Sequence, residues 1–278
     1  MKIINLIENT EGVMGCVPAH GLSFYIETQK HRLLLDLGPS GETLANAEKL
    51  GVDLSVVDTV ILSHGHYDHS GGILPFTEVN GTAAIYMQKS AVQDYYADDG
   101  EAAAERYRYI GIDKEIPDLP QVRFIDGDIH IDDELELFTI PCRSHELPST
   151  NRRLLVRMDS GFLRDDFRHE HFLVIHTEGK SVLMSGCAHN GILSILDEYT
   201  DRFGQAPDLV VSGFHLMKKV EYADSEIAEI CHIAEELKKY PTRFITCHCT
   251  GTAAFDIMKG IMGDSLEYVH CGEEISLI

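Results

Sequence analysis

Hydrophobic and polar positions alternate in short runs along the first third of the chain, which is typical of strands. Residues 41–50 instead carry apolar residues at helical spacing and end before Gly51, so they predict a helix. Strands are predicted at residues 3–7, 22–27, 32–37, 59–62 and 83–87. A second helix is expected from Ser90 into the acidic run at 97–100, and residues 101–110 are open to a helical continuation in which Tyr107 and Tyr109 line a pocket.

The rest of the chain shows a second set of strands and then a regular alternation of helices and strands. Strands are predicted at residues 122–125, 135–140, 154–158, 171–177, 181–185, 209–212 and 243–247. Helices are predicted at residues 192–203, 225–239 and 252–261. We expect a single α/β domain over residues 1–278, with two mixed sheets packed face to face and helices outside. The polar, Arg-rich segment 142–170 is the expected excursion from this core, and we interpret it as a flap.

Composition limits the partners of the chain. Its 278 residues include 45 acidic and 23 basic ones, a formal net charge of -22 that disfavours nucleic acid and anionic membranes as partners. A small-molecule substrate, even an anionic one, stays compatible because bound metal ions set the local potential. Seven cysteines, an odd number, and a start at Met1 without a signal-like segment favour a reducing cytoplasm. The oligomeric state stays open.

The segment His64-Gly65-His66-Tyr67-Asp68-His69 follows the apolar run that ends at Leu62. Alternate residues of an extended loop point the same way, so His64 and His66 can share one metal ion. Asp68 and His69 can face a neighbouring ion. Imidazole with carboxylate suits zinc, iron or manganese, and few protein ligands per ion leave room for water and substrate. A His-rich loop without function is the alternative.

Three later segments repeat one arrangement, an apolar strand followed by a small residue and a histidine. The histidines are His189, His215 and His248. Each alone has a structural alternative, but the recurrence favours a shared site. Asp36 ends a buried strand and is expected either to hold a metal-bound histidine or to cap a turn.

Other histidines carry weaker signals. His169, His171 and His176, in or beside the Arg-rich segment, stay ambiguous. We interpret the histidines in plain strand or helix contexts as structural or surface residues, and these are His31, His130, His232 and His270.

These motifs together resemble the metallo-β-lactamase superfamily of αββα hydrolases. Along nearly the whole chain they resemble its subfamily of metal-dependent hydrolases related to the archaeal dihydropterin–ribofuranosylaminobenzene-phosphate synthase. The H-x-H-x-D-H segment 64–69 indicates the superfamily. The subfamily is indicated by the segments 20–24, 36–38, 46–47, 63–72, 166–167, 186–192, 213–216 and 248–251.

The resemblance implies two divalent metal ions, zinc first, with six protein ligands. One ion is assigned to His64, His66 and His189, and the other to Asp68, His69 and His248. Cys187 stands where the superfamily has a bridging Asp, and it is a weak candidate for a bridging thiolate.

His145 is the alternative to His189 as third ligand of the first ion. We expect His189 instead, because it follows a buried strand and a Gly whereas His145 lies in the polar segment.

The expected activity is hydrolysis of a small, anionic, phosphate-ester-like substrate by a metal-activated water. Asp68 would orient the water and His215 would protonate the leaving group. Expected substrate contacts are His20, from the opposite sheet, and Arg152 and Arg153 in the flap. The alternative is a transferase that joins a pterin diphosphate to an aromatic amine, and a metal sensor without turnover is a third reading.

Overall fold

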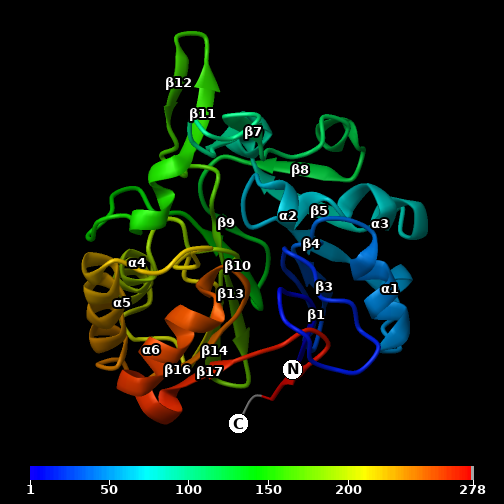
Figure 1. The fold of residues 1–278 in the computed structure, drawn as a ribbon. Helices are drawn as coiled ribbons and strands as arrows, with labels where there is room; N and C mark the ends of the chain where they lie inside the picture. Colours follow the sequence, from blue (N-terminus) through cyan, green and yellow to red (C-terminus); the bar gives the residue numbers. More distant parts are fainter. Residues whose placement is uncertain (277–278) are drawn as a thin grey trace. The chain divides into compact units, whose positions relative to one another are not determined.

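The computed structural model describes residues 1–276, which divide into two compact units. The first unit comprises Met1–Ile129, Arg153–His171 and the residues from His270 onward. The second unit comprises His130–Arg152 and Phe172–Val269. Figure 1 shows the chain in the order of its sequence. The expectation of a single domain stays a prediction.

The first unit is built on a seven-stranded mixed sheet. Its order is β18 (Glu274–Ile275), β1 (Lys2–Ile7), β2 (Ser23–Glu27), β3 (Arg32–Leu35), β4 (Thr59–Ile61), β5 (Ala84–Gln88) and β8 (Val122–Ile125). Pairs from β18 to β3 are antiparallel, and pairs from β3 to β8 are parallel. In parallel strands the carboxyl ends meet at one edge, so the loop after β4 leaves the sheet there.

One face of this sheet packs against helices. They are α1 (Glu42–Lys49) and α3 (Ile73–Val79), with the short α2 (Tyr67–Ser70) between them in sequence (Figure 1). Alternate strand residues such as Leu34 and Val60 pack with Ile73 and Phe76 of α3 in one core cluster. The period of two in the strands and the helical spacing at α1 meet in this cluster, as the pattern predicted. Short 3-10 turns are η1 (Leu54–Val56), η2 (Lys89–Val92) and η3 (Ile116–Asp118).

A separate four-stranded sheet also belongs to the first unit. Its antiparallel order is β12 (Gly161–Arg164), β11 (Leu154–Met158), β6 (Asp94–Asp98) and β7 (Tyr107–Tyr109). The predicted helices over 90–110 are therefore wrong. Tyr95 and Ala97 are buried while their neighbours in β6 are only partly so, which is a period of two that the acidic Asp98-Asp99-Gly100 hid. The segment 142–170 contains η4 (Ser149–Arg153) and the β11–β12 hairpin, and its action as a flap stays a prediction.

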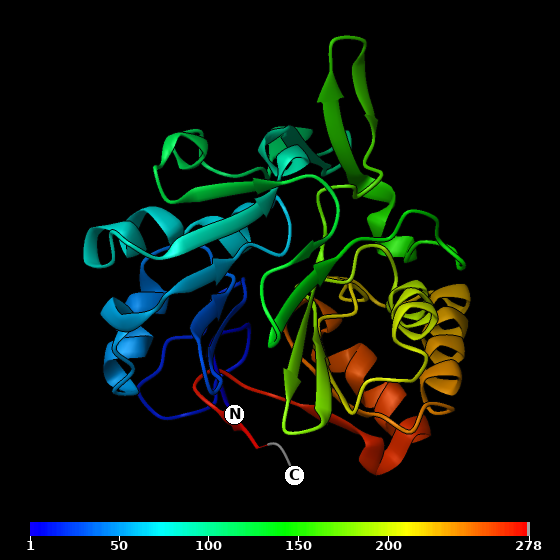
Figure 2. The same cartoon turned by 180° about the vertical axis from the view of Figure 1, so that it is seen from behind.

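The second unit has its own seven-stranded mixed sheet (Figure 2). Its order is β17 (Leu266–Tyr268), β16 (Arg243–Thr246), β15 (Leu209–Ser212), β14 (Lys180–Met184), β13 (Phe172–Thr177), β10 (Leu135–Phe138) and β9 (Ile129–His130). The strands from β14 to β17 are parallel, and β10, β13 and β14 are antiparallel.

The core of the second unit lies between this sheet and three helices, α4 (Ile192–Phe203), α5 (Asp224–Leu237) and α6 (Thr252–Met262). Phe172, Leu183 and Phe244 of the strands pack there with Leu196 and Met258 of the helices. Two 3-10 turns, η5 (His248–Thr250) and η6 (Gly263–Ser265), flank α6. The alternation of helices and strands predicted for this part is confirmed. Among the described residues, no helix has the length and apolar character needed to cross a membrane.

Candidate metal centre

The His64–His69 loop leaves the carboxyl end of β4 and changes conformation within six residues. His66 is extended, with φ -109° and ψ 149°, and α2 begins directly after it. His64 and His66 thus lie on the extended part, whereas Asp68 and His69 lie on the helical turn. The ring centroid of His64 lies 4.6 Å from that of His66 and 4.1 Å from that of His69. The loop therefore gathers four buried donor side chains in the first unit.

Asp36 fixes two of these rings. Its Oδ2 accepts from His69 Nδ1 at 2.7 Å and from Ser63 Oγ at 2.7 Å, and Ser63 Oγ lies 2.8 Å from His64 Nδ1. The Ser63 hydroxyl donates its proton to Asp36, so the Ser63 oxygen must accept from His64 Nδ1. His64 and His69 therefore both carry their proton on Nδ1. Each then presents the Nε2 lone pair, the form in which histidine binds metal. The expected contact of Asp36 with a histidine of the loop is confirmed, and the turn-cap alternative is not needed.

A second pair, Asp165 and His169, supports the loop from the segment that follows β12; the sequence left His169 ambiguous and gave no signal for Asp165. Gly65 N–H donates to His169 Nδ1 at 2.9 Å, and His169 Nε2 lies 3.0 Å from Asp165 Oδ2. Because Nδ1 is the acceptor, His169 carries its proton on Nε2 and gives it to Asp165. His169 therefore positions the loop rather than binding metal, although its ligand atoms, those of Asp165 and those of His66 lie within 4.8 Å of one another.

Gly65 is required where the loop meets η2. A Cβ on Gly65 would lie 2.5 Å from the carbonyl oxygen of Ala91, closer than real Cβ contacts.

Burial first, and then the charge of His169, lowers the pKa of His66 to about 3. His66 is thus held neutral, which is the protonation state a metal ligand needs.

His171 gives a prediction for acid stability. It is buried, its Nδ1 accepts from Gln88 Nε2 at 3.2 Å, and burial lowers its pKa to about 4. A pKa below that of the unfolded chain means that the unfolded state takes up the proton first, so stability falls as pH drops from about 6.5 toward 4. Between about pH 7 and pH 5, the unfolding free energy of His171→Gln should therefore fall by roughly 2 kcal/mol less than that of the wild type.

Urea unfolding of both proteins at the two pH values measures this effect. His130→Gln, at an exposed position, is the control and should keep the wild-type loss. An equal loss in wild type and His171→Gln would contradict the prediction.

His189 follows β14 and is fixed by Asn151 of η4 in the second unit. Asn151 Nδ2 donates to the His189 carbonyl at 2.7 Å, which leaves its Oδ1 to accept from His189 Nδ1 at 3.0 Å. His189 therefore has the same tautomer as His64 and His69 and also presents Nε2. The backbone of the preceding Ala188 is left-handed, with φ 52°.

His215 and His248 also stand on strained backbone, with φ of 50° and 46°. The ring of His215 lies 4.1 Å from that of His189, and its Nδ1 lies 2.9 Å from Thr150 Oγ1. Left-handed backbone is rare for histidine and gathers at functional sites, so these positions point to function independently of side-chain chemistry. Asp36, with φ 61°, shares this feature.

Cys187 lies beside His248 and Cys249, with ligand atoms of the three within 4.8 Å of one another. Cys187 and Cys249 are both buried thiols, and Cys249 Sγ accepts from the backbone N–H of His215 at 3.3 Å. This placement is compatible both with a thiolate ligand and with a packed filler next to the histidines.

Changing Cys187 to Ser separates the two roles. As a filler, the expected result is full metal occupancy with near-normal activity, because serine has nearly the same volume. Loss of one metal equivalent, measured by elemental analysis, would instead identify a ligand. Cys231→Ser on α5, away from the predicted ligands in sequence, is the control and should change neither quantity.

The remaining predicted residues separate by unit. His20 is half exposed in the first unit, with Nε2 3.6 Å from Asp68 Oδ2. His145 of the second unit directs Nε2 to Asp197 at 3.0 Å and is partly exposed, unlike the buried His189. Arg153 binds Asp99 at 2.8 Å in the first unit. Arg152 belongs to the second unit, where its charge helps to lower the pKa of Glu226 after the larger contribution of Lys218 and the Ala223 backbone.

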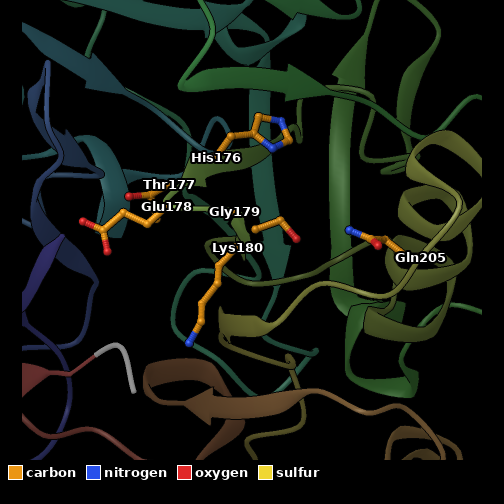
Figure 3. A pocket seen from close by; sticks show the side chains of 7 residues that line it. His176, Thr177, Glu178, Gly179, Lys180 and Gln205 are labelled. Atoms are coloured by element: carbon orange, nitrogen blue, oxygen red, sulfur yellow. The ribbon is translucent and has the colours of Figure 1, made fainter.

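A surface pocket of about 350 Å³ lies in the second unit at the turn between β13 and β14 (Figure 3). It is lined by His176, Thr177, Glu178, Gly179, Lys180, Ser181 and Gln205. None of the predicted ligands lines it, and His176 packs its ring against Phe203 at 5.7 Å. We interpret His176 as structural.

Known proteins resemble the chain in both sequence and fold. The family model described as the metallo-beta-lactamase superfamily matches residues 17–147. An uncharacterized protein of Methanocaldococcus jannaschii is 28% identical over 265 residues, which cover 93% of each chain. The 7,8-dihydropterin-6-methyl-4-(beta-D-ribofuranosyl)-aminobenzene-5'-phosphate synthase of that organism is 27% identical over 296 residues, covering 99% of this chain and 96% of the synthase.

A crystal structure described as a metal-dependent hydrolase of the beta-lactamase superfamily is 29% identical. It superposes with a TM-score of 0.81 and covers 100% of this chain and 99% of its own. The chain has the α/β fold of the metallo-β-lactamase superfamily, and its residues 17–147 match the model of that family. The resemblance seen in the motifs, including the relationship to the archaeal synthase, is confirmed.

Proposed function

We propose that the protein is a metal-dependent hydrolase of a small, phosphate-ester-like anion. The observation that carries the proposal is the shared tautomer of His64, His69 and His189. In each unit a buried partner accepts the Nδ1 proton, which puts the ring lone pair on Nε2, an atom through which histidine binds metal ions.

The proposed ligand sets are those expected from the motifs. His64, His66 and His189 would hold one divalent ion, zinc first, and Asp68, His69 and His248 a second. Bound ions of this kind supply an acidified water and stabilise charge on a phosphoryl oxygen. Imidazole and carboxylate donors fit zinc, and they also fit iron or manganese.

The protein's own residues would then share the remaining work. Asp68 would orient the attacking water as well as bind metal. His215, whose Nδ1 lies 2.9 Å from Thr150 Oγ1, would protonate the leaving oxygen from its imidazolium form, with both ring nitrogens protonated. His20, Arg152 and Arg153 would contact the substrate.

A transferase is the second candidate, because the synthase of Methanocaldococcus jannaschii aligns with 99% of this chain. The two candidates differ in their need for an amine. A screen of the metal-loaded protein should include phosphoesters, lactones and a pterin diphosphate, the last with and without an aromatic amine. Phosphate release from esters without amine supports the hydrolase, whereas diphosphate release only with amine overturns it in favour of the transferase.

A further inference from the structure

Asp99 joins two arginines that are far apart in sequence. It directly follows β6, and its Oδ2 accepts from Arg108 Nε of β7 at 2.8 Å. Its Oδ1 accepts from Arg153 Nη2, at the end of η4, at 2.8 Å. All three residues belong to the first unit. One carboxylate thus holds two guanidinium groups side by side, with 42% and 48% of the two arginine side chains exposed.

The neighbouring arginine of the same hairpin is arranged differently. Arg106 gives Nε and Nη2 to Asp98 and Nη1 to Glu101, so two carboxylates neutralise one guanidinium. Arg108 and Arg153 instead share the Asp99 carboxylate, so two guanidinium groups are held side by side in a chain of formal charge -22. Exposed Arg–Asp pairs add little to stability, so folding gives a weak reason for bringing the two guanidinium groups together.

The arginine pair adjoins the predicted metal ligand Asp68 through Tyr67. Tyr67 is the first residue of α2, its N–H donates to the carbonyl of Ile110 just after β7 at 2.9 Å, and its side chain is hydrogen-bonded to Arg108. These two contacts tie Arg108 and the end of β7 to the turn that carries Asp68.

We propose that Arg108 and Arg153, held together by Asp99, form a subsite that binds the phosphoryl group of the substrate beside Asp68. This inference rests on the proposed function and names the recognition element of that site. Neither contact with Asp99 uses all five N–H donors of a guanidinium, and planar guanidinium forks match phosphoryl oxygens. Arg108 gave no signal in the sequence, because it lies within a segment that the pattern predicted to be helical.

Inorganic phosphate is the probe. Its dissociation constant for the metal-loaded protein is measured by isothermal titration calorimetry in wild type, Arg108→Gln, Arg153→Gln and the control Arg106→Gln. Loss of one charged fork should raise the dissociation constant about tenfold in the first two variants, with metal content and unfolding midpoint unchanged. Arg106→Gln removes the same charge from the same hairpin and should leave phosphate binding within about twofold of wild type.

The outcomes separate this inference from the function it rests on. Unchanged phosphate binding in Arg108→Gln and Arg153→Gln overturns the subsite, even if the protein hydrolyses phosphoesters. Equal weakening in Arg106→Gln also overturns it, because bulk charge would then explain the effect. If phosphate binding depends on Arg108 and Arg153 but no phosphoester in the screen is hydrolysed, the subsite stands and the proposed hydrolase fails.

Discussion

A protein with His64→Ala and His66→Ala together will lose one of its two expected transition-metal ions. Both rings lie on the extended part of the loop after β4, and two imidazoles are removed from the proposed set of three. Loss of a partner that merely orients a ligand typically weakens binding or activity 10–100-fold, so loss of two ligands should exceed about 100-fold in activity. Elemental analysis of the gel-filtered protein gives the metal content, and a phosphoester assay gives the rate.

The matched control removes two histidines that lie elsewhere. His130 and His232 are exposed, and His130→Ala with His232→Ala should keep both metal content and activity. Unchanged metal content in the His64/His66 double variant would remove the proposed centre altogether.

Asp36→Asn should weaken metal binding 10–100-fold although Asp36 binds no metal itself. Asparagine tolerates the left-handed φ of 61° and can still accept from Ser63 N, which now lies 2.7 Å from Oδ1. Its amide N–H₂ would, however, face His69 Nδ1–H and the Ser63 hydroxyl, two donors that need an acceptor. His69 would then turn or change tautomer, and its Nε2 would no longer be presented to a metal ion.

Metal titration with a competing chelator measures this loss, and urea unfolding shows whether the fold survives. Asp58→Asn is the control, because Asp58 also pairs with a histidine, His31, at 2.9 Å but at a partly exposed position away from the loop. Equal metal affinity in wild type and Asp36→Asn would mean that Asp36 only supports the turn.

Local patterns in the sequence predicted the two main sheets and the histidines of the candidate centre. Each of His64, His189 and His248 lies within five residues of the end of a buried strand, so strand prediction and chemistry pointed to the same positions. Whether these histidines share metal ions stays a prediction.

Features that depend on distant partners were not predictable. His169 looked ambiguous because its partner Gly65 is 104 residues away, and Asp165 acts on the loop only through His169. The sheet containing β6 was missed because β6 pairs with β11, some sixty residues later in the chain. The alternation of buried residues in β6 also spans only Tyr95 and Ala97. Left-handed backbone at His215 and His248 was not predictable, because histidine adopts this conformation more often than most residues but still in a small fraction of cases.

The separation of the two sheets in the first unit bears on how such proteins diverge. The β11–β12 hairpin is hydrogen-bonded to β6, not to the sheet that carries the His64–His69 loop, and its turn at Asp159 and Ser160 is exposed. Insertions are tolerated best at exposed turns of this kind. Natural or laboratory selection can therefore lengthen and vary this hairpin while the His64–His69 loop keeps its sequence. New substrate specificities can then evolve while the proposed reaction stays the same.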